Sequence, residues 1–145
     1  MNEARKPEST YAFTKIVVGD LERSAAFYKA VFDYRELQRV HAEVAGEPIE
    51  EVILLRGEDM AGEVTLVVWK WSNRPAPEGS DVILGFITSD LDTVIARTVP
   101  AGGRVVQPPR NMREHGVRVA FIVDVDGRLI EVVQMLSGAT SPRAA

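Results

Sequence analysis

The chain has 145 residues, of which 46% are hydrophobic and 26% are charged, and its formal net charge is −4. This length and composition predict a single globular domain with a sizeable core. The acidic balance argues against a nucleic-acid partner, because phosphate binding needs a concentrated basic face. The chain has no cysteine, which excludes disulfides, zinc–thiolate sites and a thiol nucleophile.

The chain also lacks the sequence signs of a membrane or secreted protein. Its longest apolar runs, such as VTLVVW at 64–69, are too short to span a bilayer. The N-terminal MNEARKPEST has no apolar stretch of the kind found in signal peptides. We therefore expect a cytoplasmic protein with no membrane partner. Residues 1–11 and 137–145 are mostly small and polar, and we expect them to form flexible tails.

The first half begins with an apolar β-branched run, Ile16 to Val18, that suits a buried strand. Asp20 follows as a candidate helix N-cap. An apolar helical face then recurs at Leu21, Ala25, Tyr28 and Phe32. Three strand-like runs complete this half, namely RELQRVHAE (35–43), EEVILLRG (50–57) and GEVTLVVWKW (62–71).

The second half follows the same order after a linker rich in Pro, Gly and Ser, residues 72–81. A strand is predicted from Ile83 to Thr88, and a helix after the N-cap candidate Asp90 ends at Pro100. The remaining strand-like runs are GRVVQPP (103–109), VRVAFIVD (117–124) and RLIEVVQM (128–135). The last two runs are joined by Val125-Asp126-Gly127, a strong hairpin signal.

The two halves form a repeat. Asp20 and Asp90 lie 70 residues apart, and G-D-L-E at 19–22 matches S-D-L-D at 89–92. Each half therefore predicts the order β-α-β-β-β, and a repeat this long indicates two modules in one fold. We predict one α+β domain over residues 1–145, with modules of about 12–72 and 80–136.

Two segments carry a resemblance to a known family, VVGDLERSAAFY (17–28) and AFIVDVDGRLIEVVQ (120–134). Together with the repeat, they resemble the vicinal oxygen chelate superfamily of glyoxalase I, bleomycin-resistance proteins and extradiol dioxygenases. The second segment is similar to the family pattern A-F-x-x-D-P-D-G-x-x-I-E-L, with Val125 in place of the usual Pro. The resemblance covers residues 12–136. It implies that each module curls a mixed β-sheet into a half-open cup and that two modules enclose a small-molecule site.

Members of this family that use a metal carry one ligand on the first and last strand of each module. The resemblance places these positions at Phe13, Leu66, Ile83 and Glu131. Three of these side chains have no lone pairs, and a single carboxylate does not hold a divalent ion tightly. We therefore expect no metal and no other cofactor.

Glu131 and the histidines are the candidates for acid–base chemistry. Glu131 is either a relic carboxylate that is paired or facing water, or a partly buried general acid or base with a raised pKa. His115, in the loop PPRNMREHGVRV (108–119), is either solvated or a proton shuttle and hydrogen-bond donor. His41 is either exposed on an outer face or part of the site.

Strand alternation extends the predicted site to further side chains. It places Lys15 beside Phe13, and it places Val64, Val68 and Lys70 beside Leu66. The arginines of the second module are either solvated or form an anion clamp at the mouth of the cup. They are Arg104, Arg110, Arg113 and Arg118. Trp69 and Trp71 form either a dimer surface or the aromatic wall of a pocket.

Two functions fit this sequence. The first is a metal-independent isomerase, epimerase or lyase acting on a small carbonyl- or carboxylate-bearing substrate. In it Glu131 moves a proton, and His115 or an arginine stabilises the oxyanion. The substrate-binding residues would be Phe13, Lys15, Leu66, Val68, Ile83 and Arg113.

The alternative is a non-catalytic drug- or metabolite-binding protein like the bleomycin-resistance members, which also lack the metal ligands. A hydrogen bond between Glu131 and His115 or Lys15 favours catalysis, whereas a cup whose only polar group is Glu131 favours binding. In either case we expect a homodimer, because a half-open sheet leaves strand edges and apolar patches bare.

Overall fold

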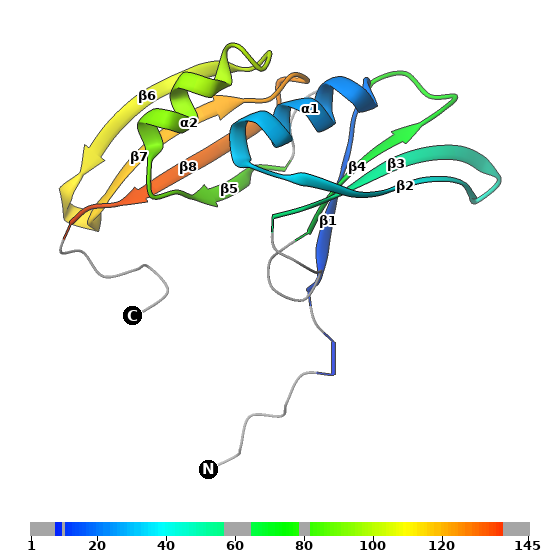
Figure 1. The fold of residues 1–145 in the computed structure, drawn as a ribbon, viewed down its shortest axis with the longest axis horizontal. Coiled ribbons are helices and arrows are strands. Elements are labelled where there is room, and N and C mark those ends of the chain that lie inside the picture. Colours follow the sequence, from blue (N-terminus) through cyan, green and yellow to red (C-terminus); the bar gives the residue numbers. More distant parts are fainter. Residues whose placement is uncertain (1–7, 10, 57–64, 79–81, 138–145) are drawn as a thin grey trace.

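The structure is a computed structural model, and it describes residues 8–9, 11–56, 65–78 and 82–137. The order β-α-β-β-β occurs twice along the chain, as the repeat predicts (Figure 1). The predicted tails lie largely outside the described residues, and so does Val64. The elements are β1 (Phe13–Val17), α1 (Leu21–Phe32), β2 (Arg35–Val44), β3 (Glu47–Leu55), β4 (Thr65–Trp71), β5 (Leu84–Ile87), α2 (Leu91–Thr98), β6 (Arg104–Met112), the 3-10 turn η1 (Arg113–His115), β7 (Val117–Val123) and β8 (Leu129–Met135).

Each module forms its own four-stranded mixed sheet, with the orders β1-β4-β3-β2 and β5-β8-β7-β6. The first strand of each module pairs in parallel with the last one, and the other pairs are antiparallel. Figure 1 shows the two sheets side by side, with α1 and α2 next to each other. The predicted α+β fold of two modules is confirmed.

The turn after the first strand of each module is a helix cap, as predicted. The Asp20 carboxylate accepts a hydrogen bond from the Arg23 backbone N–H at 3.1 Å. Asp90 accepts one from the Thr93 backbone N–H at the same distance. Each bond satisfies one of the free donors at a helix N-terminus. The repeated G-D-L-E and S-D-L-D segments therefore have a structural role.

One hydrophobic core is shared by both modules. It forms where the helix-facing sides of the two sheets meet α1 and α2. The ring of Phe32 on α1 stacks on that of Phe86 on β5, with centroids 3.8 Å apart. The core residues contributed by the strands are Ile16, Val52, Leu54, Leu66, Val68, Ala120, Ile122, Ile130 and Val132.

The opposite side of each sheet, which we call the open face, is not covered by any helix of the described residues. Side chains alternate along a strand, so the neighbours of core residues point to the open face. In the first module these include Phe13, Lys15, Val67 and Trp69, which the strand register brings together. In the second module they include Glu131, Val133, Gly85, Phe121 and Val119.

A buried polar network joins the two modules. Asp124 is 2% exposed, and its Oδ2 accepts hydrogen bonds from the Tyr28 hydroxyl at 2.6 Å and from Arg128 Nη1 at 2.7 Å. The other guanidinium nitrogen of Arg128 donates to the Val17 carbonyl at 2.7 Å. We call these four residues the Asp124 network. It connects α1 and β1 with the turn between β7 and β8.

The network keeps Tyr28 protonated. Burial, reinforced by the negative charge of Asp124, raises the pKa of the Tyr28 hydroxyl well above its usual value. The hydroxyl therefore donates its hydrogen bond throughout the neutral range. A buried carboxylate that loses a donor stays desolvated without full compensation, which is costly.

We expect Tyr28→Phe to lower the free energy of unfolding by about 1.5–3 kcal/mol, because it removes a buried hydrogen bond to a charged group. Urea unfolding followed by circular dichroism measures this. The matched control is Tyr11→Phe, since Tyr11 is 72% exposed, and its effect should stay within about 0.5 kcal/mol. Equal effects of the two changes would show that the network contributes no stability.

Candidate functional site

Three of the predicted site positions lie where the sequence placed them, at the open faces. Phe13 begins β1 and is 45% exposed, and Ile83 lies just before β5 and is 58% exposed. Glu131 is half-buried in the middle of β8, with Gly85 of β5 on one side and Phe121 of β7 on the other.

The fourth position, Leu66, lies on the other face of β4. Leu66 and Val68 are 4% and 0% exposed and belong to the core beneath α1. Their expected place beside Phe13 and Lys15 is therefore wrong, and Lys70 shares their face by alternation.

The internal repeat identifies the residue that takes the place of Leu66. The Val18 N–H donates to the Trp69 carbonyl, and in the second module the Thr88 N–H donates to the Val133 carbonyl. Trp69 and Val133 are 64 residues apart. By the same offset, Glu131 corresponds to Val67. Val67 pairs with Lys15 just as Glu131 pairs with Gly85.

Leu66 and Ile83 nevertheless border a common cavity. It has a volume of about 300 Å³ and lies between the start of β4 and β5. Neither Phe13 nor Glu131 lines it. This cavity therefore brings together two of the four predicted positions.

The donor set of these positions does not fit a metal ion. With Val67 in place of Leu66, the four side chains still supply a single carboxylate, that of Glu131. In the part of the chain that the structure describes, no group of three or more His, Asp or Glu side chains lies close enough together to hold a metal. Divalent cations need several oxygen or nitrogen ligands. We therefore assign no step to a metal.

Glu131 has room around it and no partner among the described residues. Its carboxylate makes no hydrogen bond or ion pair with any residue that the structure describes. Gly85 stands beside it without a side chain, and a methyl group added at Gly85 would meet no atom within 4 Å. The open face at this point is a carboxylate next to free space, bordered by apolar residues.

The two histidines and Arg113 lie away from Glu131. Arg113 and His115 are the exposed ends of η1, before the start of β7 at Val117. Phe121, which pairs with Glu131, is four residues further along β7, or about 13 Å at the usual strand rise. The side chain of His41 is 75% exposed, and its Nδ1 lies 3.4 Å from a Glu50 carboxylate oxygen.

Lys15 is held on the open face of the first module by a partner that the sequence analysis did not find. Its ammonium lies 2.8 Å from the carboxylate of Glu51, a residue that is 8% exposed. The same ammonium lies 4.6 Å from the ring centroid of Trp69 and 5.6 Å from that of Phe13. We call Lys15, Glu51, Trp69 and Phe13 the lysine cage.

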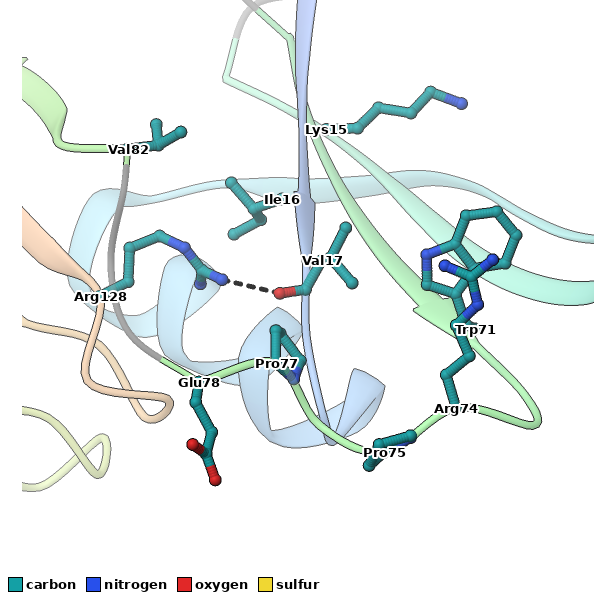
Figure 2. A pocket seen from close by; sticks show the side chains of 10 residues that line it. All are labelled: Lys15, Ile16, Val17, Trp71, Arg74, Pro75, Pro77, Glu78, Val82 and Arg128. Atoms are coloured by element: carbon teal, nitrogen blue, oxygen red, sulfur yellow. Dashed lines mark hydrogen bonds between the residues drawn. The ribbon is translucent and has the colours of Figure 1, made fainter.

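A groove of about 640 Å³ adjoins the lysine cage. It runs beside β1, an edge strand of its sheet, and Figure 2 shows Lys15, Trp71 and Arg128 around it. The Arg74 guanidinium stacks on the Trp71 ring at 4.0 Å and donates to Glu47 at 2.9 Å. Trp71 thus forms an aromatic wall of the groove, one of its two predicted roles.

Comparison with known proteins identifies the family. The model of the Glyoxalase/Bleomycin resistance protein/Dioxygenase superfamily matches residues 10–132. The chain belongs to this superfamily. One relative in it, named "Probable lactoylglutathione lyase" and found in Vibrio cholerae, is 28% identical over 124 residues, which are 83% of this chain and 87% of the relative. The lactoylglutathione lyase of Arabidopsis thaliana is 25% identical over 122 residues, which are 81% of this chain. The match spans only 41% of the Arabidopsis protein.

Solved structures of superfamily members share the fold. A glyoxalase-family protein from Bacillus cereus matches with a TM-score of 0.78 at 16% identity, over 94% of this chain and 100% of that one. A glyoxalase I variant from Zea mays matches with a TM-score of 0.71 at 17% identity, over 88% of this chain and 46% of that one.

No helix among the described residues is long and apolar enough to cross a membrane.

The corrected register can be tested by restoring metal ligands. The test variant combines Phe13→His, Val67→Glu and Ile83→His with the natural Glu131. We expect it to bind one transition-metal ion per chain, whereas the unaltered protein binds none. The matched control replaces Val67→Glu with Leu66→Glu. Both positions are about equally buried, but only the Val67 side chain shares the face of Phe13. Elemental analysis after dialysis measures the metal. Metal bound by the Leu66→Glu set, or by neither set, would contradict the register.

Proposed function

We propose that the protein binds a small organic molecule at the open faces of its sheets, without a metal and without catalysing a reaction. The observation that carries this proposal is the isolation of Glu131. It is the only carboxylate at the superfamily's ligand positions, and neither predicted acid–base partner lies within its reach in the chain.

In the enzyme that the sequence analysis considers, Glu131 moves a proton and a second polar group stabilises the oxyanion. Lys15 does not serve Glu131, because its ammonium is paired with Glu51. His115 lies in η1, before the start of β7, too far from Glu131 for a hydrogen bond. Among the described residues, neither of the two expected polar partners reaches Glu131. This arrangement favours a binding protein over an enzyme.

Catalysis remains the second candidate, and one observation favours it. Glu131 is half-buried next to the free space at Gly85, where a reacting group of a substrate would fit. This candidate is a metal-independent isomerase, epimerase or lyase. Two relatives are named lactoylglutathione lyases, but Phe13, Val67 and Ile83 do not provide the ligands that the superfamily's metal chemistry requires.

We also propose that the protein is a homodimer whose second copy covers exposed apolar side chains near β1 and β5. Exposed apolar side chains that lie together are typical of an interaction surface, and Tyr11, Val82 and Ile83 line one cavity. The side chains that the second copy would cover are Tyr11, Phe13, Val82, Ile83 and Ile87, each 45% to 72% exposed. A cytoplasmic location and the lack of a nucleic-acid partner stay predictions.

The two candidate functions respond differently to Glu131→Gln. The change keeps the shape of the side chain but removes its titration. Ligands are first found by a thermal-shift screen of the unaltered protein, and their affinity and turnover are then measured. A binding protein should keep its affinity within a few-fold and show no turnover in either form. Turnover that falls by about 10²–10⁴-fold in Glu131→Gln, but not in the exposed control Glu114→Gln, would establish the enzyme instead.

The dimer is expected to appear in sedimentation equilibrium at micromolar concentration, with twice the 16.0 kDa mass of one chain. Ile87→Lys should shift it to the monomer, because the charge would be buried against the second copy. Val99→Lys is the matched control, since Val99 is also an exposed apolar residue but follows the last residue of α2. A monomeric unaltered protein would contradict the proposal.

A further inference from the structure

We propose that the lysine cage is a subsite for an organic cation, either a primary ammonium or a guanidinium group, and that Lys15 fills it with its own ammonium. This inference rests on the proposed function, in which the open face binds a small molecule. It adds the chemical class of the ligand, which the fold does not specify.

The cage surrounds the ammonium with the groups that recognise a cation. A carboxylate oxygen of Glu51 lies 2.8 Å from Nζ, and the ring centroids of Trp69 and Phe13 lie 4.6 and 5.6 Å away. The faces of aromatic rings carry partial negative charge and attract cations at these distances. Three sides of the position are therefore favourable to positive charge.

The burial of Glu51 decides the sign of the charge that this place accepts. Glu51 is 8% exposed, and a buried carboxylate is stable only with a positive or hydrogen-donating partner. A ligand anion that paired with Lys15 would come close to this carboxylate and draw its partner away. A ligand cation that replaced Lys15 would leave Glu51 paired.

Lys15 is also easily exchanged. Its side chain is 37% exposed, and it extends from an edge strand on a flexible stem, so its ammonium can move into water. A ligand cation that takes over the pairing with Glu51 leaves no buried charge unpaired. The release of Lys15 is therefore compensated when the ligand binds.

The surroundings provide space and one further contact. Lys15 and Trp71 both line the groove of about 640 Å³, so an apolar or aromatic ligand body can lie in it. Arg74 already stacks on Trp71, which leaves Trp69 as the ring for the ligand cation. Among the described residues, the buried indole nitrogen Nε1 of Trp69 has no hydrogen-bond partner. A ligand acceptor atom near the cation would satisfy it.

The test compares three probes of similar shape and different charge, namely benzylamine, benzyl alcohol and benzoate. Calorimetry measures their affinities for the unaltered protein, for Lys15→Ala and for Lys15→Ala combined with Glu51→Gln. We expect Lys15→Ala to bind benzylamine at least about tenfold more tightly than the unaltered protein does, because the cage is vacated. It should prefer benzylamine to both other probes, and the added Glu51→Gln should abolish the preference.

Lys29→Ala is the matched control. Lys29 is paired with Glu36 at 3.2 Å, and its side chain is 38% exposed, close to the value for Lys15, but no aromatic ring contacts its ammonium among the described residues. Its removal should leave benzylamine affinity unchanged. If Lys15→Ala fails to fold, Lys15→Met, which keeps the stem, is put through the same comparison.

Three results would overturn the inference. If benzoate binds the unaltered protein best and loses affinity in Lys15→Ala, Lys15 is an anion-binding residue, and the proposed binding function stays intact. Equal affinity for benzylamine and benzyl alcohol would remove the role of charge. Folded Lys15→Ala that binds none of the probes would show that the cage is not a subsite, while the ligand screen of the unaltered protein decides separately whether the protein binds small molecules.

Discussion

The arrangement of the two modules depends on one buried carboxylate. Asp124 lies at the turn between β7 and β8, and its charge is compensated by donors from Tyr28 and Arg128. Arg128 in turn reaches the Val17 carbonyl at the end of β1. A buried charge tolerates few arrangements of its donors, since each lost bond leaves it desolvated and unpaired. The network therefore fixes the second module against the helix and the first strand of the first module.

This packing determines which surfaces remain for function. The helix-facing sides of both sheets are buried in one shared core, in which the ring of Phe32 stacks on that of Phe86. The open faces of the two sheets are left to meet a ligand. They differ chemically: that of the first module carries an ion pair between aromatic rings, whereas that of the second carries Glu131 among apolar side chains. The superfamily fold is kept, while three of the four positions that the resemblance assigns to metal ligands hold the apolar side chains of Phe13, Val67 and Ile83.

The sequence was sufficient for the features that depend on local patterns. The caps at Asp20 and Asp90, the turn at Gly127 and the order of elements all rest on residues close together in the chain, and the structure confirms them. Gly127 has a φ of 82°, a conformation that glycine adopts without strain.

The prediction from sequence was wrong or incomplete where strand alternation allowed either of two neighbouring residues to face the ligand side. The run from Thr65 to Trp69 is buried on both faces of the sheet, so alternation could not decide whether Leu66 or Val67 faces the ligand side. The adjacent Glu50 and Glu51 posed the same problem, because nothing local shows which one is buried. Only the register of β3 on β4, which sets Glu51 opposite Trp69, reveals the partner of Lys15.

The central claim is that side chains of the open faces, and not a metal, hold the ligand. It is tested most directly by calorimetry with the tightest ligand of the unaltered protein, before and after exhaustive dialysis against a chelator. The proposed function predicts the same dissociation constant in both conditions, and no change when zinc, nickel or manganese ions are added back. Binding that disappears with the chelator and returns with one of these ions would contradict it.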